Sequence, residues 1–256
     1  MIDLAIISGS GFYDFPALEK PEKVKISTSF GDVVLEKGIV RGKTVVFLAR
    51  HGKDHAILPH KINYRANMMA LSEMEVKSLI MTSVCGVLDK SIPLTKIIVF
   101  DDLYYPNNRL PDGEICCIYE KEGDKNRGHY IFDKPFSEDL REQILDATEN
   151  PLSSGVYAHA SGPRFNSKSE IKMFQGHADF ISQTAGPEII LAGELEIPCA
   201  LVGYGVDYAN GVTEVPTPID VLSKNLKESK AVFTELLLKV IDKYQTPRFT
   251  GINYRF

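Results

Sequence analysis

Leu4-Ala5-Ile6-Ile7-Ser8-Gly9-Ser10-Gly11 begins as a continuous apolar run and ends abruptly in glycine and serine. Such a run is typical of a strand that is covered on both faces of a parallel sheet. The glycines after it let the backbone approach a ligand, and Ser10 can donate from its hydroxyl and its amide. The stretch is neither a Walker A loop nor a G-x-G-x-x-G motif, so a tight exit from the strand is the alternative interpretation.

Similar apolar runs alternate with helical patterns along the chain. The predicted strands are Leu4–Ile7, Thr44–Ala49, Ser78–Ser83, Lys96–Phe100, Gly155–His159 and Pro198–Gly203. The predicted helices are Asn63–Met74, Pro187–Leu195, opened by its proline, and the amphipathic Val221–Tyr244. This alternation predicts an α/β protein with a mixed or mostly parallel central sheet. We expect residues 1–256 to form a single domain, with Tyr105–Arg127 as an exposed excursion.

Composition and charge exclude several classes of protein. The 256 residues are 44% hydrophobic and 25% charged, as in soluble globular proteins. The net charge of −5 argues against a nucleic-acid partner. No apolar run is long enough for a membrane span, and Met1–Ile7 does not resemble a signal peptide. Cys85, Cys116, Cys117 and Cys199 fit neither a zinc site nor a disulfide framework, so we expect a cytoplasmic protein with free thiols.

Polar side chains follow two other predicted strands. Arg50 and His51 come after one strand, and Ser83 stands at the end of another. Parallel strands present ligands at their carboxyl ends, and Arg and His suit the recognition of an oxyanion. Together with Ser10 these residues predict a shared anion site, although an Arg and a His in a solvent-exposed loop are the alternative. His55 is interpreted as a structural or surface residue rather than a metal ligand.

Two loop-like stretches, Gly162–Ser167 and Gln183–Glu188, each lead into a helix-prone run. Polar loops that open helices bring N–H groups to one point, which suits an anionic or polyhydroxyl ligand. Asp207 follows the last predicted strand, and it can act as a general acid if burial raises its pKa. The alternatives are two ordinary surface turns and an aspartate that bonds its own backbone.

Together these stretches resemble the family of methylthioadenosine phosphorylases and trimeric purine nucleoside phosphorylases. The most specific block is Arg50-His51-Gly52, followed by Pro59-His60-Lys61-Ile62-Asn63-Tyr64-Arg65-Ala66-Asn67. The other matching stretches, in family order, are Ser8–Phe12, Thr82–Leu88, Gly162–Ser167, Thr184–Glu194 and Asp207-Tyr208. The resemblance implies the nucleoside phosphorylase fold, with a central, mixed, partly barrel-like sheet flanked by helices. It also implies phosphorolysis of a purine nucleoside, with phosphate as co-substrate and with no metal or organic cofactor.

The resemblance implies a role for each matching residue. Phosphate would be held by Ser10, Arg50, His51, Ser83, the Val84 amide and Thr184. The base would meet Phe165, Asn166, Asp207 and Ala209, and the ribose would meet the Gln183 backbone. Pro218 and Val221 would line an apolar 5′ pocket, and His129 would come from a neighbouring subunit of a homotrimer or dimer of trimers. The implied catalytic residues are Asp207, Arg50 and His51; an ordinary exposed histidine is the alternative for His129.

Departures from the family pattern leave the substrate open. Methylthioadenosine phosphorylases read Thr-Asp-Tyr-Asp where this chain reads Val206-Asp207-Tyr208-Ala209, so the second carboxylate is absent. Asp207 argues for adenine, whereas Ala209 resembles the enzymes for 6-oxopurines and methylthioinosine. Asn166, Ser161 and Gln183 stand where Ser, Glu and Met are usual. Methylthioadenosine is placed slightly ahead of methylthioinosine and inosine; hydrolysis and a catalytically inactive nucleoside-binding protein are the other hypotheses.

Overall fold

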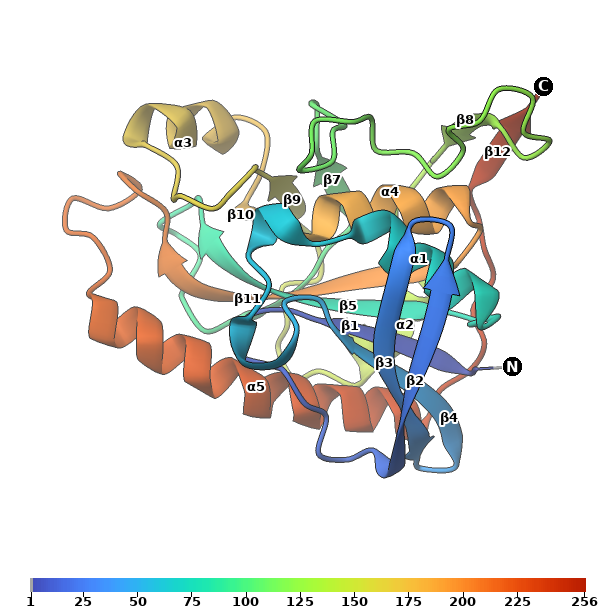
Figure 1. Ribbon diagram of the computed structural model, residues 1–256. Coiled ribbons are helices and arrows are strands. Elements are labelled where there is room, and N and C mark those ends of the chain that lie inside the picture. Colours follow the sequence, from blue (N-terminus) through green and yellow to red (C-terminus); the bar gives the residue numbers. More distant parts are fainter. Residues whose placement is uncertain (1) are drawn as a thin grey trace.

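A ten-stranded mixed sheet with helices on both faces forms the centre of the molecule, in a computed structural model that describes residues 2–256 (Figure 1). The strands are β1 (Leu4–Ser8), β2 (Glu19–Thr28), β3 (Gly31–Val40), β4 (Lys43–Ala49), β5 (Leu79–Val87), β6 (Ile97–Val99), β7 (Asp102–Tyr104), β8 (Gly128–Ile131), β9 (Val156–His159), β10 (Phe180–Ser182), β11 (Cys199–Tyr208) and β12 (Ile252–Arg255). The helices are α1 (Tyr64–Glu73), α2 (Glu138–Asp146), α3 (Lys168–Gln175), α4 (Ala185–Glu194) and α5 (Ile219–Asp242), with short 3-10 turns at Lys53–His55 and Pro59–Lys61.

β5 organises the sheet because it pairs with three other strands. β1 and β11 run parallel to it on either side, and β10 pairs antiparallel with its last two residues, Gly86 and Val87. The strand order is β2-β3-β4-β1-β5-β10-β9-β7, and β11 branches from β5 and pairs in turn with β6. The sheet contains both parallel and antiparallel pairs and has helices on both faces. The predicted α/β class is confirmed.

β1 shows why both faces of the sheet are covered. Leu4 and Ile6 pack in the cluster that contains α2 and α5. Ala5 and Ile7 point to the opposite face and pack with α1 and α4. Because consecutive strand residues alternate between faces, a strand that is apolar at every position needs a helical layer on each side. Full burial of each Leu or Ile contributes about 1.5–3 kcal/mol.

Two strands extend beyond their predicted ends, and this changes where two site residues lie. β5 continues to Val87 and β11 to Tyr208, because the two strands stay paired along their whole length. Asp207 therefore lies within a strand, not after it as predicted, and Ser83, predicted as the last residue of its strand, lies inside β5. α4 also begins earlier than predicted, at Ala185, and Pro187 occupies its first turn. Proline is tolerated there because the first N–H groups of a helix have no partner within the helix.

Several elements were not predicted, and one prediction was wrong in part. The β2–β3 hairpin was missed because exposed charged residues obscure the alternation in β2. The short helices α2 and α3, capped by Ser137 and Ser167, were also missed. The stretch predicted to be an exposed excursion buries Leu110, Cys116 and Ile118 against the core.

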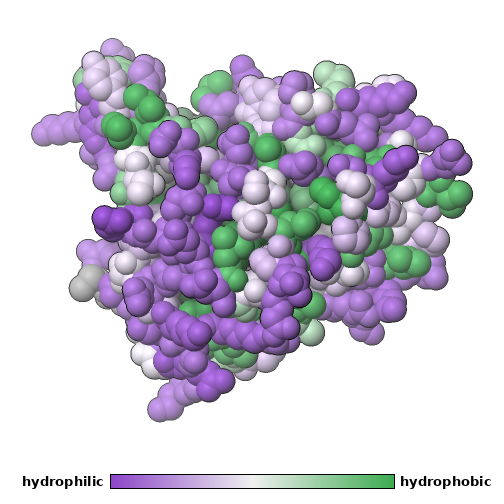
Figure 2. Space-filling view, turned by 180° about the vertical axis from the view of Figure 1, so that it is seen from behind, coloured by the Kyte–Doolittle hydropathy of each residue, from purple (hydrophilic) through white to green (hydrophobic). Residues whose placement is uncertain are grey.

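All four cysteines are free thiols, as predicted. Within residues 2–256, every helix is too short or too polar to cross a bilayer. Seen from behind, the molecule is mostly hydrophilic, with hydrophobic residues gathered in smaller patches (Figure 2). The candidate site lies where the main strands of the sheet end.

Candidate active site

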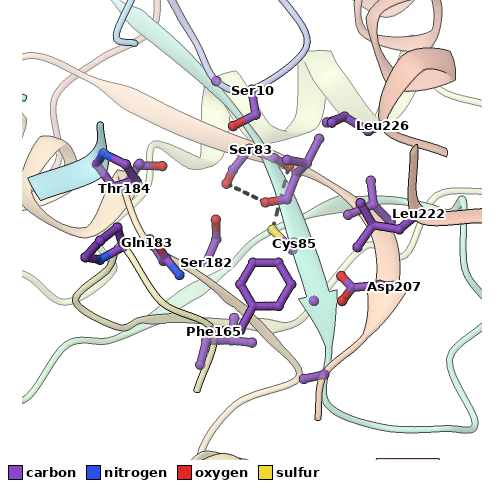
Figure 3. Close-up of a pocket in the computed structure, with 18 of the residues that line it drawn as sticks. Ser10, Ser83, Cys85, Phe165, Ser182, Gln183, Thr184, Asp207, Leu222 and Leu226 are labelled. Atoms are coloured by element: carbon purple, nitrogen blue, oxygen red, sulfur yellow. Dashed lines mark hydrogen bonds between the residues drawn. The ribbon is translucent and has the colours of Figure 1, made fainter. Parts of the chain in front are cut away.

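A cavity of about 310 Å³ opens at the carboxyl ends of β1, β4, β5, β10 and β11 (Figure 3). Loops after β9 and β10 and the start of α5 complete its walls. The predicted site residues that line it are Ser10, His51, Ser83, Val84, Phe165, Asn166, Gln183, Thr184, Asp207 and Ala209. The predicted site residues outside its lining are Arg50, His129, Pro218 and Val221.

Three hydroxyl groups and the imidazole of His51 line the cavity. Ser10 and Ser83 lie close together there, and Thr184 lies to one side (Figure 3). Thr184 is the N-cap residue of α4, yet its side chain makes no capping bond, so its hydroxyl is available to a ligand. The amino end of α4 adds a partial positive charge. Hydroxyl donors at a helix N-terminus suit a small anion.

His51 is held as a neutral ring in one tautomer. Its Nδ1 lies 2.9 Å from the Ile57 carbonyl oxygen, which only accepts, so Nδ1 carries the proton. Burial, opposed by that bond and reinforced by Arg50, lowers the pKa of His51 to about 4. Nε2 therefore accepts a hydrogen bond at neutral pH.

His55 lines the cavity, a position that its interpretation as a structural or surface residue did not anticipate. Its ring stacks on His51 with 4.2 Å between centroids, and its Nδ1 lies 3.0 Å from the Tyr13 hydroxyl. The side chain thus shields the His51 ring from solvent. A histidine inside a polar loop gives no sequence signal of such stacking, because the 3-10 turn Lys53–His55 creates it.

Arg50 lies behind the cavity wall. Its Nε and Nη2 donate to the two carboxylate oxygens of Glu188, each at 2.7 Å, and its Nη1 donates to the Thr82 carbonyl at 2.8 Å. Burial opposes the charge on Arg50, but the adjacent Glu188 carboxylate raises its pKa overall. Three of the five guanidinium N–H groups are thus occupied within the protein. Direct contact of Arg50 with phosphate stays a prediction.

Asp207 is the titratable group at the other end of the cavity. The register between β11 and β5 shifts between Gly205 and Asp207, which leaves Val206 as an extra residue and turns the Asp207 side chain toward the cavity. Burial raises the pKa of Asp207 to about 6. A carboxyl group with this pKa can hold a proton near neutral pH, as general acid catalysis requires.

The two loops singled out in the sequence meet beside Asp207. Gln183 donates from its side-chain amide to the Arg164 carbonyl at 2.9 Å, which ties the second loop to the first. Asn210 donates to the Asn166 carbonyl at 2.8 Å and ties the first loop to the end of β11. Phe165 projects between them, lining the cavity while its side chain stays 65% exposed (Figure 3).

The apolar side of the cavity comes from α5, but not from the residues predicted. Pro218 and Val221 lie at the exposed start of this helix, whereas Leu222 and Leu226 face the cavity opposite Thr184 (Figure 3). Their spacing of four residues places them on one helical face, a signal that was present in the sequence. His129 lies on β8, at the far end of the molecule (Figure 1). Its entry into a neighbour's site stays a prediction.

The sequence of this chain matches a known family. A profile described as the phosphorylase superfamily matches residues 3–242. The chain belongs to the phosphorylase superfamily. This superfamily member is 37% identical to the 6-oxopurine nucleoside phosphorylase of Pyrococcus furiosus, over 82% of this chain and 81% of the relative. It is 33% identical to the S-methyl-5′-thioadenosine phosphorylase of Hyperthermus butylicus, over 94% and 88% of the two chains.

A solved structure shares the fold of this superfamily member. The methylthioadenosine phosphorylase from Schistosoma mansoni, in complex with adenine, superposes with a TM-score of 0.83. The alignment covers 94% of this chain and 91% of that chain, at 24% sequence identity. At this identity the likeness establishes the fold alone.

Proposed function

We propose that this superfamily member is a purine nucleoside phosphorylase. It transfers the pentosyl group of a purine nucleoside to inorganic phosphate, and it releases the free base and a pentose 1-phosphate. One observation carries the proposal: a single cavity joins a cluster of hydroxyls and a neutral imidazole to an aromatic, Asp207-bearing end. Phosphate is a co-substrate, and the proposed chemistry uses no metal or organic cofactor.

The phosphate end supplies orientation and neutral hydrogen-bond donors. Ser10, Ser83 and Thr184 offer hydroxyls to the oxygen atoms of phosphate. The Nε2 atom of His51 accepts the proton of a P–OH group, because Nδ1 already donates to a carbonyl. Held in this way, one phosphate oxygen is free to attack C1′ of the sugar. Placement of the nucleophile converts a bimolecular encounter into a step within one complex.

The base end stabilises the leaving group. As the bond between C1′ and the purine breaks, the sugar becomes positively charged and the purine becomes electron-rich. A protonated Asp207 donates to the N7 region of the purine, where the negative charge develops. Bound phosphate stabilises the sugar cation at the same time. The two ends therefore act on the two charges of one transition state.

The absence of an acceptor at Ala209 favours a 6-oxopurine. Asp207 has a single proton, which goes to N7 in the proposed step and serves either class of purine. A 6-aminopurine has an amine with two hydrogens, and Asp207 can accept only one of them. Ala209 offers no acceptor for the other, and an unpaired buried donor costs about 1–3 kcal/mol. We therefore place inosine and methylthioinosine ahead of methylthioadenosine.

Leu222 and Leu226 form the apolar side of the cavity and suit a 5′-deoxy or 5′-methylthio group. The proposed substrate that fits both ends is 5′-methylthioinosine. Methylthioadenosine is the second candidate, because Asp207 retains one acceptor for a 6-amine.

Assembly, location and pathway belong to the same proposal. The site of His129 on β8, far from the cavity of its own chain, is compatible with a homotrimer or dimer of trimers in which it reaches a neighbour's cavity. The four free thiols are compatible with the reducing cytoplasm. Release of a reusable base and a sugar phosphate suits purine salvage, and methionine salvage if the substrate carries a 5′-methylthio group.

The test is a steady-state comparison of methylthioinosine, inosine, methylthioadenosine and adenosine at saturating phosphate. We expect base release that requires phosphate, with the highest kcat/KM for methylthioinosine. Release of base without phosphate would show a hydrolase. Binding of nucleoside and phosphate without turnover of any of the four would show an inactive homologue.

A further inference from the structure

A buried ion pair lies directly behind the hydroxyl-lined end of the cavity. The guanidinium of Arg50 binds both carboxylate oxygens of Glu188, and both side chains are fully buried. Two parallel charge-assisted hydrogen bonds hold the guanidinium in a single orientation. Glu188 does not line the cavity, and the proposed reaction gives it no task. The pair joins residues that lie 138 positions apart in the chain.

The guanidinium contacts the segments that carry the predicted phosphate ligands. Its Nη1 donates to the Thr82 carbonyl at 2.8 Å, directly before Ser83 in β5. Through Glu188 it is joined to the first turn of α4, the helix whose N-cap is Thr184. Movement of the guanidinium would therefore disturb both the β5 hydroxyl and the α4 hydroxyl.

The loop after β1 contacts the same guanidinium. A Cβ atom on Gly9 would lie 2.7 Å from Nη1 of Arg50, so only a glycine leaves room for the side chain at this position. Gly9 directly precedes Ser10, and Arg50 directly precedes His51. The ion pair thus contacts or continues into the four segments that carry the side chains of the proposed phosphate site.

We propose that Glu188 is a positioning residue of the phosphate site, which acts by fixing Arg50 where it joins these four segments. This inference rests on the proposed phosphorolysis. Glu188 does not touch the substrate. It sets the distances between the side chains that bind phosphate. The base end is built on other elements, so loss of Glu188 should change phosphate binding far more than nucleoside binding.

Glu188→Gln tests the proposal, because it keeps the size of the side chain and one acceptor while removing the charge and the second acceptor. We expect the KM for inorganic phosphate to rise about tenfold or more, and the KM for nucleoside to change by less than about twofold. Glu138→Gln is the matched control. Glu138 also pairs with a mostly buried arginine, Arg141, but on α2 and outside the cavity lining. Its two KM values should stay at the wild-type values.

A double variant separates positioning from a general loss of structure. In Arg50→Met/Glu188→Met both charges are removed together, which avoids an unpaired buried charge and favours folding. If Glu188 acts through Arg50, the double variant and Arg50→Met should have the same phosphate KM within about twofold.

The inference would be wrong if the phosphate KM of Glu188→Gln equalled that of the wild type. It would also be wrong if the phosphate KM of the double variant exceeded that of Arg50→Met by the factor that Glu188→Gln causes alone. A wild-type protein that releases base without phosphate would instead refute the proposed function. A phosphate-dependent wild type with an unaffected Glu188→Gln would refute the positioning role alone.

Discussion

The two ends of the cavity differ in how firmly the fold holds them. At the phosphate end, His51, Ser83 and Thr184 are buried, on or directly beside the strands and the helix that surround the Arg50–Glu188 pair. At the base end, Phe165 projects from a loop that is tied down by amide hydrogen bonds. A small anion of constant shape favours rigid, preorganised donors. Bases that differ at one ring position can be told apart by changes in a few side chains on a more adaptable wall.

The largest expected effect is on stability, at the rigid end. Glu188→Ala leaves the Arg50 charge buried and unpaired, so we expect the free energy of unfolding to fall by about 3–5 kcal/mol. The control is Glu138→Ala, whose carboxylate is 37% exposed and should contribute less than about 1 kcal/mol. Urea denaturation of both variants measures the difference. Equal losses would mean that the Arg50–Glu188 pair contributes no more to the free energy of unfolding than the Arg141–Glu138 pair of α2 does.

The next effect is on catalysis, at the base end. Asp207→Ala removes the proposed proton donor to the purine, and we expect kcat to fall about 100-fold. The phosphate KM should change little, because Asp207 lies away from the hydroxyl cluster. Initial rates with methylthioinosine at saturating phosphate check this. An unchanged kcat would remove Asp207 from the mechanism.

Substrate choice should respond to position 209. Ala209→Asp restores a carboxylate that can accept from a 6-amine, so we expect the kcat/KM ratio of methylthioadenosine to methylthioinosine to rise about tenfold. Ala209→Leu has a similar size without a hydrogen-bond acceptor and serves as the control. The idea that Ala209 selects the base would be wrong if the ratio were the same in the variant and the wild type.

The buried carboxyl group of Asp207 also predicts a pH-dependent stability. Because burial raises its pKa to about 6 from 3.8, the folded state binds the proton more tightly than the unfolded state does. Its contribution to stability is therefore full below pH 4 and is lost as the pH rises through 6. The uncharged Asp207→Asn should raise Tm by a few degrees at pH 8 and by nothing at pH 4. A Tm difference that is independent of pH would contradict the burial of the charge.

The smallest expected effect on stability is at Phe165. The ring is 65% exposed, so Phe165→Ala should change the free energy of unfolding by less than about 0.5 kcal/mol. Loss of stacking on the base should still raise the nucleoside KM several-fold. Thermal denaturation and nucleoside titration measure the two effects. A large loss of stability would show that this loop is part of the rigid core.

The sequence was most informative where local patterns carry the signal. The predicted Asn63–Met74 helix matches α1, with Asn63 as its N-cap, because periodicity and capping act within a few residues. Val221 was placed in the apolar wall by the family resemblance, although the helical spacing of Leu222 and Leu226 already indicated the face of α5 that lines the cavity. His55 was missed because its stacking on His51 needs a folded turn.

By itself, the sequence determined the α/β class, the residues after the strands and the polar loops that build the cavity, because strand, turn and helix preferences are local. The tertiary structure decided which of these groups touch. It paired Arg50 with Glu188, and it placed Asp207 on a bulge where burial raises its pKa. Such effects depend on distance and solvent exclusion between segments far apart in the chain, and no local pattern encodes them.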